Sequence, residues 1–208
     1  MKTVENGFVM LKDSEVQQYY TLLSDLMKFL TQNNIVFWAC SGTLLGSVRH
    51  KAIIPWDDDM DLMFFAKDED TVCGLKPLLL SEGFDLIKWW GGYKFYRKPE
   101  LDTQKEPYPF IDLFPVKKIM KTYRFARPFA LLRWTKEYFF PEELFPLDQG
   151  AFGPLSVPVP HDSHPYLDRL YGSDWNSVGK QSYDHKNNKK IKPARIQRLD
   201  DGKKISEK

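Results

Sequence analysis

The spacing of apolar residues near the N-terminus predicts an amphipathic helix. Apolar side chains recur at intervals of three and four residues between Val16 and Leu30, and this period places them on one face of a helix. The segment from Ser14 to Gln17 has the form of a capping box. We therefore expect the helix to begin at this segment and to end before Asn33.

Short apolar runs and helical patterns alternate along the rest of the chain. The patterns predict strands at residues 35–40, 59–65 and 110–114, a hairpin with a glycine turn at residues 84–97, and helices at residues 43–49, 68–80, 124–138 and 163–171. Residues 141–160 are rich in Pro and Gly, which predicts irregular or short-stranded structure. The alternation favours an α/β or α+β domain, and we predict the α+β class with a mixed sheet and flanking helices.

Length and composition fit one globular domain. The chain has 208 residues, of which 42% are hydrophobic, and this is enough to bury a core. No apolar run approaches the roughly 20 residues that span a bilayer, and residues 1–13 lack the apolar stretch of a secretory signal. Two cysteines, Cys40 and Cys73, make no disulfide framework. We expect a cytoplasmic protein, with the Golgi lumen as the alternative if the chain is a fragment.

Charge is unevenly distributed along the chain. The net charge is +2, but residues 180–208 contain 10 Lys/Arg and 4 Asp/Glu. We predict a domain at residues 1–179 and a flexible basic tail at residues 180–208. Such a tail can meet nucleic acid or an anionic membrane surface. The interpretation that we favour for this segment is a frayed, solvated terminus.

The most informative segment is an acidic run before an apolar strand. Four of the five residues from Asp57 to Asp61 are aspartates, and charges so close together repel one another. Asp59 and Asp61 share one face of the predicted strand, where two carboxylates suit the hard ions Mg²⁺ or Mn²⁺. An EF-hand calcium loop is disfavoured because Leu62 stands where that loop needs glycine. A solvated acidic turn is the other alternative.

A further carboxylate lies in a later apolar strand. Asp112 is flanked by apolar residues from Phe110 to Phe114, and an unpaired buried carboxylate is costly. If this strand lies beside the strand at residues 59–65, Asp112 completes a cluster of three carboxylates. Such a cluster can hold two metal ions about 3.5–4 Å apart. Alternatively, Asp112 pairs with an arginine or caps a turn.

A glycine turn upstream is a candidate phosphate site. Ser41 and Gly42 stand between a predicted strand and a predicted helix, where backbone N–H groups favour a phosphate. Arg49 follows at the far end of the helix, and its guanidinium can bind phosphate through two hydrogen bonds. Lys94 can add positive charge from the hairpin. The alternatives are a plain strand-to-helix turn and, for Lys94, a solvated strand face.

These motifs together resemble the LicD family. The similarity rests on SGTLLGSVRH at residues 41–50, followed by IPWDDDMD at residues 54–61. Later matches are IDLFP at residues 111–115, VPVP at residues 157–160 and YLDRLYGSDW at residues 166–175. The family includes bacterial phosphorylcholine transferases and is related to the fukutin group of animals. The resemblance extends from about residue 35 to residue 175, so the basic tail lies outside it.

The resemblance implies a fold, a reaction and a set of site residues. The family is similar in fold to DNA polymerase β-type nucleotidyltransferases, and its activity is metal-dependent transfer of a phospho-alcohol, such as phosphocholine or ribitol phosphate. The donor would be a CDP-alcohol, the acceptor a glycan or lipid-linked sugar, and CMP would be released. The implied catalytic and metal-binding residues are Asp59, Asp61 and Asp112. The candidates for phosphate or substrate binding are Ser41, Gly42, Thr43, Arg49, Asp57, Asp58 and Lys94.

Two other classes of function remain open from the sequence. One is a nucleotidyltransferase that acts on RNA or on a small molecule, which would use the basic tail on nucleic acid. The other is a binding module that keeps the fold without turnover. We expect a CDP-alcohol and a glycan or lipid-linked acceptor as partners, no nucleic acid, and peripheral membrane contact through the basic tail.

Overall fold

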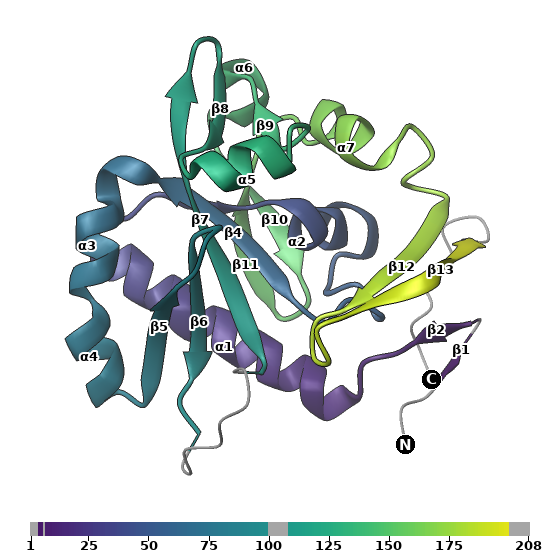
Figure 1. Cartoon of the computed structure of the whole chain (residues 1–208), viewed down its shortest axis with the longest axis horizontal. Helices are drawn as coiled ribbons and strands as arrows, with labels where there is room; N and C mark the ends of the chain where they lie inside the picture. Colours follow the sequence, from purple (N-terminus) through teal and green to yellow (C-terminus); the bar gives the residue numbers. More distant parts are fainter. Residues whose placement is uncertain (1–3, 6, 100–107, 200–208) are drawn as a thin grey trace.

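The chain folds around a mixed β-sheet, shown in Figure 1. The computed structural model describes residues 4–5, 7–99 and 108–199. Within these residues, seven strands form the main sheet in the order β3-β4-β7-β6-β5, with β8 and β9 continuing from β7. Their bounds are Phe37–Ala39 (β3), Met60–Phe65 (β4), Phe84–Lys88 (β5), Tyr93–Arg97 (β6), Phe110–Ile119 (β7), Thr122–Phe125 (β8) and Tyr138–Phe139 (β9). Strands β4 and β7 are parallel, whereas the other pairs in this sheet are antiparallel.

Helices and helical turns connect and cover the strands. They are α1 (Asp13–Gln32), α2 (Ser41–Leu45), the π-helical turn η1 (Gly46–His50), the 3-10 turn η2 (Ala66–Asp68), α3 (Glu69–Gly74), α4 (Lys76–Ser81), α5 (Pro128–Arg133), α6 (Pro141–Leu144) and α7 (His164–Tyr171). These elements confirm the predicted α+β class. In the described part of the chain, every helix is too short or too polar to cross a bilayer.

Helix α1 forms as its apolar spacing predicts, but it begins earlier. Leu23, Leu26 and Leu30 are buried, and the helix packs against β6 and β7 (Figure 1). The helix begins at Asp13, and the Glu15 carboxylate accepts a hydrogen bond of 3.0 Å from the backbone N–H of Lys12. The predicted capping box at residues 14–17 is therefore wrong. The capping hydrogen bond is made two residues earlier, from the N-cap residue Lys12 to Glu15, and it satisfies a backbone N–H that has no partner within the helix.

The segment after β7 departs from the predicted helix at residues 124–138. Strand β7 continues to Ile119, five residues beyond its predicted end, and turns back into β8. Helix α5 is limited to Pro128–Arg133, and β9 follows it. The β-prone residues of β8 gain a ladder with β7 that an isolated helix would not provide. Residues 148–159, expected to be irregular or short-stranded, form a hairpin of β10 (Asp148–Phe152) and β11 (Leu155–Val159).

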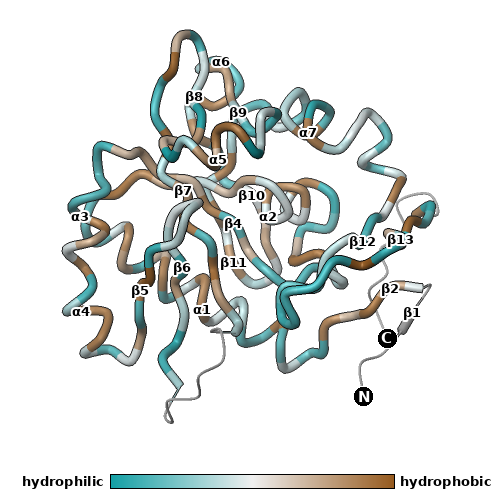
Figure 2. The backbone as a smooth tube through the Cα atoms, viewed as in Figure 1, coloured by the Kyte–Doolittle hydropathy of each residue, from teal (hydrophilic) through white to brown (hydrophobic). Residues whose placement is uncertain are grey.

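A hairpin also replaces most of the predicted flexible tail. Strands β12 (Val178–Asp184) and β13 (Lys189–Arg198) pair antiparallel, and Figure 2 shows that the end of this hairpin is strongly hydrophilic. Gln181 holds the hairpin to the rest of the chain, since its side chain exchanges hydrogen bonds with the backbone of Val9 and donates one to Trp56 O. Residues 200–208 of the predicted tail lie outside the described residues.

The turn between β10 and β11 requires glycine. Gly153 has a positive φ of 60°, and a Cβ atom there would stand 2.3 Å from Cζ of Tyr20. The Tyr20 hydroxyl in turn accepts a hydrogen bond of 3.1 Å from the backbone N–H of Ile53. This turn therefore packs directly on α1 and on the loop before β4.

We predict that Gly153→Ala lowers the free energy of unfolding by about 1–3 kcal/mol, because alanine would combine backbone strain with an overlap on the Tyr20 ring. The control is Gly74→Ala, since no atom lies within 4 Å of a Cβ built on Gly74. That control should be stabilised by about 0.5–1 kcal/mol, as expected for alanine in a helix. Urea denaturation of both variants measures the difference, and equal stabilities would contradict the prediction.

Candidate active site

The parallel pairing of β4 and β7 brings the predicted carboxylates together. Asp61 on β4 is paired in register with Asp112 on β7, and Asp59 directly precedes β4. One carboxylate oxygen from each of the three residues lies within 4.8 Å of the others. The structure thus assembles the cluster that the spacing predicted, while the roles of its members stay predictions.

The cluster concentrates negative charge in a poorly hydrated place. Asp61 and Asp112 are buried. Burial and then the charges of Asp59 and Asp112 raise the pKa of Asp61 well above its usual value. Burial raises the pKa of Asp112 to about 7, although the neighbouring Lys94 opposes this rise. The folded chain therefore holds these carboxylates in an unfavourable state that an added cation would relieve.

Lys94 is the cation that faces Asp112. The two residues are cross-strand partners on β6 and β7, and Lys94 Nζ lies 3.1 Å from Asp112 Oδ1. The ammonium group also lies over the rings of Phe110, at 3.3 Å, and Trp89, at 4.9 Å. Lys94 is thus held in place by an ion pair and two aromatic faces, and it lines the same cavity as the carboxylates.

The donor atoms of the cluster fit a divalent metal ion. Asp112 Oδ1 is buried, and Lys94 Nζ lies 3.1 Å from it as an ion pair without the geometry of a hydrogen bond. Carboxylate oxygens are the ligands that hard divalent ions prefer. Lys94 and His185 are fewer than the four carboxylates of Asp57, Asp59, Asp61 and Asp112 that line the same cavity. The group of Asp59, Asp61 and Asp112 can therefore hold a metal ion.

The turn at Ser41 is tied to residues that the sequence analysis missed. Ser41 has a positive φ of 44°. Its backbone N–H donates to the Tyr166 hydroxyl at 3.0 Å, and its Oγ donates to Glu137 Oε1 at 2.9 Å. Tyr166 also donates a hydrogen bond to Glu137. Burial raises the pKa of Glu137, which Tyr166 and Ser41 oppose.

Gly42 and Thr43 contact residues of the acidic run. A Cβ atom on Gly42 would stand 2.4 Å from Asp57 Oδ2, so glycine lets the Asp57 carboxylate lie against the turn. Thr43 is buried, and its Oγ1 accepts a hydrogen bond of 2.8 Å from the backbone N–H of Asp61. Thr43 therefore anchors the start of β4 and does not line the cavity.

Arg49 holds the chain segment that leads to the C-terminal hairpin. Its Nη1 donates hydrogen bonds to Trp175 O at 2.5 Å and to Val178 O at 3.1 Å, and its Nε lies 2.9 Å from His50 Nε2. Burial lowers the pKa of Arg49 to about 10. Arg49 also lines the cavity, and its predicted contact with phosphate stays a prediction.

His185 joins the site from the hairpin. Its Nδ1 lies 3.0 Å from Asp58 Oδ1, and its Nε2 lies 3.2 Å from Asp59 Oδ2. Asp58 also accepts hydrogen bonds from the backbone N–H groups of His185 and Lys186. Although burial opposes it, the charge of Asp59 and the bond with Asp58 raise the pKa of His185 to about 9.

Asp58 therefore fastens the hairpin to the acidic run, and it lies outside the lining of the cavity at the cluster. Its predicted contact with substrate has no support in this geometry. Asp57, Asp59 and His185 form a second group whose ligand atoms lie within 4.8 Å of one another. His185 had no sequence signal because it lies in a run of charged residues without an apolar pattern.

A cavity of about 920 Å³ adjoins the cluster. Its lining includes the carboxylates of Asp57, Asp59, Asp61 and Asp112, together with Ser41, Gly42, Arg49, Lys94, Glu137 and His185. Five tryptophans line the cavity, and three of them, Trp89, Trp90 and Trp134, pack together as an aromatic surface. The cavity therefore combines converging carboxylates, cations and aromatic rings, and a concave site with a few convergent polar groups is typical of a ligand-binding pocket.

Comparisons with known proteins agree with the sequence motifs. A family profile described as "LicD/FKTN/FKRP, nucleotidyltransferase domain" matches residues 34–162. This range contains the turn at Ser41 and the three clustered carboxylates. It ends before α7 and the C-terminal hairpin.

Two curated proteins are similar over most of this chain. The uncharacterized protein RP689 of Rickettsia prowazekii (strain Madrid E) is 31% identical over 179 residues, which cover 81% of this chain and 63% of that protein. The uncharacterized protein RT0683 of Rickettsia typhi (strain ATCC VR-144 / Wilmington) is 31% identical over 182 residues, which cover 81% of this chain and 53% of that protein. The chain thus spans less than two thirds of the length of these relatives.

Solved structures with a related arrangement include two antibiotic-modifying proteins. ANT(2″)-Ia in complex with adenylyl-2″-tobramycin has a TM-score of 0.45 and 16% identity, covering 76% of this chain and 80% of that chain. The lincosamide antibiotic adenylyltransferase LnuA, bound to lincomycin, has a TM-score of 0.44 and 13% identity, covering 79% of this chain and 99% of that chain. Because these scores are low, the family assignment rests on the profile alone.

We predict that Mn²⁺ raises the melting temperature of the wild type and not that of Asp61→Asn. Binding to the folded state alone stabilises it by about 2.7 kcal/mol at a concentration 100-fold above Kd. Without metal, Asp61→Asn should be more stable than the wild type near pH 7. The reason is that a carboxyl whose pKa is raised on folding destabilises the folded state above its unfolded pKa.

Asp85→Asn is the matched control, because Asp85 pairs with Lys76 at 2.8 Å, away from the cluster. Differential scanning calorimetry with and without Mn²⁺ compares the three proteins. An equal Mn²⁺-induced shift in Asp61→Asn and Asp85→Asn would show that the cluster does not hold the ion.

Proposed function

Since this chain belongs to the LicD/FKTN/FKRP nucleotidyltransferase-domain family, we propose that it is a phosphotransferase. It would move a phospho-alcohol from a CDP-alcohol to a hydroxyl group of a glycan or glycolipid and release CMP. The observation that carries this proposal is the convergence of Asp59, Asp61 and Asp112 beside a cavity with cationic and aromatic walls. The family supports transfer chemistry in general, whereas the donor and acceptor are our proposal.

Asp59, Asp61 and Asp112 would hold Mg²⁺ or Mn²⁺. Their oxygens lie within 4.8 Å of one another, and Asp61 and Asp112 are buried. When bound, such an ion would neutralise negative charge on the donor diphosphate and on the leaving CMP. Thr43 supports this set through its bond to the Asp61 backbone.

The cations of the cavity would bind the phosphates of the donor. Lys94 is fixed beside Asp112, and His185 lines the same cavity between Asp58 and Asp59. The turn at Ser41 and Gly42 lines the same cavity, as does Arg49. Trp89 and Trp90 offer aromatic faces on which a base or sugar would stack.

Asp57 is the residue that we propose as the general base. In the transfer, the acceptor oxygen forms a bond to the phosphorus that bears the alcohol, and the bond from this phosphorus to CMP breaks. The hydroxyl proton passes to a carboxylate. Asp57 suits this step better than Asp112, because Asp112 is assigned to the metal ion and is paired with Lys94, whereas Asp57 lines the cavity and lies outside that group of three.

The test is a donor screen with the wild type and Asp61→Asn. The protein is incubated with Mg²⁺ and CDP-choline, CDP-ribitol or CDP-glycerol, and CMP release is measured by chromatography. We expect release from at least one donor, and a rate at least about a hundredfold lower in Asp61→Asn because charge stabilisation is lost. Asp85→Asn serves as the control and should retain the wild-type rate.

Nucleoside triphosphates form a second arm of the same screen. Release of pyrophosphate from ATP or CTP, without release of CMP from any CDP-alcohol, would favour nucleotidyl transfer to RNA or a small molecule. If no donor releases CMP or pyrophosphate, and calorimetry still detects binding of CDP-choline to the wild type, the result would favour a binding module. Either result would contradict the proposed transfer of a phospho-alcohol.

A further inference from the structure

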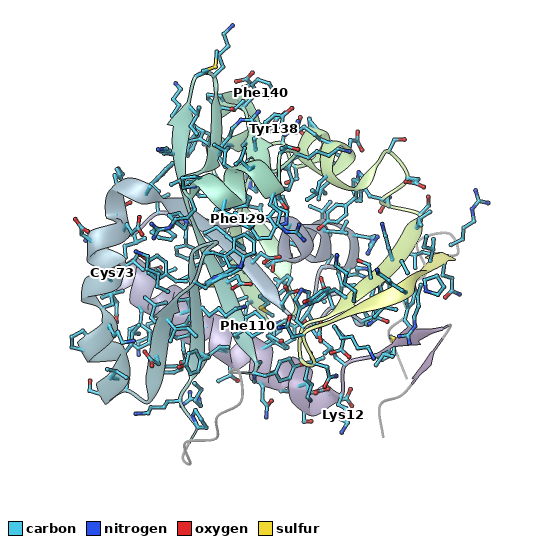
Figure 3. The ribbon with its side chains drawn as sticks, in the orientation of Figure 1. Lys12, Cys73, Phe110, Phe129, Tyr138 and Phe140 are labelled. Atoms are coloured by element: carbon cyan, nitrogen blue, oxygen red, sulfur yellow. The ribbon has the colours of Figure 1, made fainter. Side chains whose placement is uncertain are left out.

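Helix α5 presents large apolar side chains to solvent. Phe129 is 60% exposed and Leu132 is 77% exposed. The two residues are three positions apart, so they project from the same face of the helix. Figure 2 shows α5 as a hydrophobic segment, and Figure 3 labels Phe129 on it. Two such residues on a helix of six residues form an exposed apolar surface, and such surfaces often mark a site of interaction with a protein or a membrane.

This surface is continuous with the mouth of the cavity. The ring of Trp90, which is 44% exposed, lies 4.9 Å from the ring of Phe129. Trp90 also stacks on Trp134 at 4.9 Å, and both tryptophans line the cavity, as does Arg133. We call Trp90, Phe129 and Leu132 the apolar lip, because they connect the cavity to the outer surface.

The segment around the apolar lip is strongly basic. Residues 117–136 contain Lys117, Lys118, Lys121, Arg124, Arg127, Arg133 and Lys136, and no aspartate or glutamate. Lys121, Arg133 and Lys136 are exposed. Arg127 is partly neutralised by an ion pair with Glu69. The turn between β7 and β8 adds Met120, which is 92% exposed.

We propose that the apolar lip and the basic residues of segment 117–136 dock on an anionic phospholipid surface. The exposed Phe129 and Leu132 side chains insert into the boundary between headgroups and acyl chains, while lysine and arginine attract anionic headgroups. An aliphatic group such as Leu132 favours a bilayer over a nucleic acid, which would need flat rings for stacking. The docked protein would hold its cavity mouth at the membrane.

This docking is independent of the transfer proposed above. Binding to vesicles requires the lip and the basic segment, whereas CMP release requires the carboxylate cluster. A chain that binds vesicles without turnover, or turns over without binding, is therefore distinguishable in experiment. The surface also differs from the basic tail at residues 180–208, for which the sequence analysis named peripheral membrane contact.

The test is flotation of the full chain with two kinds of vesicle, one of pure phosphatidylcholine and one of phosphatidylcholine mixed with phosphatidylglycerol. We expect the wild type to float with the mixed vesicles only. The double variant Phe129→Ser/Leu132→Ser should lose at least about tenfold in partition coefficient, because two inserting side chains are removed. The control Leu78→Ser/Leu80→Ser removes two leucines of α4 that are 44% and 41% exposed, and it should bind as the wild type does.

A second set of variants tests which of the two basic segments, residues 117–136 or β13, binds the vesicles. Arg133→Gln/Lys136→Gln should weaken binding to the mixed vesicles, whereas Lys189→Gln/Lys190→Gln on β13 should leave it unchanged. Circular dichroism melting of each variant confirms that it is folded, which is expected because these side chains are exposed.

Three results would overturn the proposal. They are equal binding to the two vesicle types, an equal loss in the α4 control, and a loss confined to the β13 variant. A single-stranded RNA oligonucleotide is measured in parallel by fluorescence anisotropy. If RNA binds, and Phe129→Ser/Leu132→Ser abolishes that binding, the lip is a nucleic-acid surface and the membrane assignment fails.

Discussion

The mutual repulsion of aspartates on two adjacent parallel strands is the constraint on which the site depends. Pairing β4 with β7 places Asp61 beside Asp112 and brings Asp59 within ligand distance of both. The pairing gains the burial of apolar neighbours such as Leu62 and Leu113, and this gain offsets the cost of the crowded carboxylates. The core thus stabilises an arrangement that the charges alone would disfavour, and the three carboxylates can hold a cation.

Local pattern was enough to predict much of this arrangement. The helix at α1, the hairpin of β5 and β6, and the acidic strand all have strong periodic or turn signals. Asp112 could be selected because a carboxylate inside an apolar strand is unusual. The residues between β7 and α6 were predicted less well. The predicted helix at residues 124–138 was wrong because its first residues form β8, which pairs with the part of β7 beyond Phe114. The apolar pattern gave no sign that β7 continues past Phe114.

The partners of the turn at Ser41 could not be found in this way. Glu137 and Tyr166 reach Ser41 from positions 96 and 125 residues away in sequence. Glu137 lies in no recognised motif, and Tyr166 begins the motif at residues 166–175, which does not indicate its contact with Ser41. His185 was hidden in a segment that looked like a solvated terminus. In each case the contact depends on long-range packing, which single-sequence periodicity does not encode. The chemistry of these three residues is nevertheless what fixes the turn and the acidic run in place.

The guanidinium of Arg49 has a consequence for the extent of the functional unit. It joins the helical turn after the Ser41–Gly42 motif to the carbonyls of Trp175 and Val178, which lie beyond the range of the family profile. Cutting the chain at residue 162 would remove both carbonyl acceptors of the half-buried Arg49 guanidinium, and would deprive Asp58 of the backbone donors at residues 185 and 186. The smallest autonomous piece of this protein therefore has to include the hairpin that closes over its acidic loop.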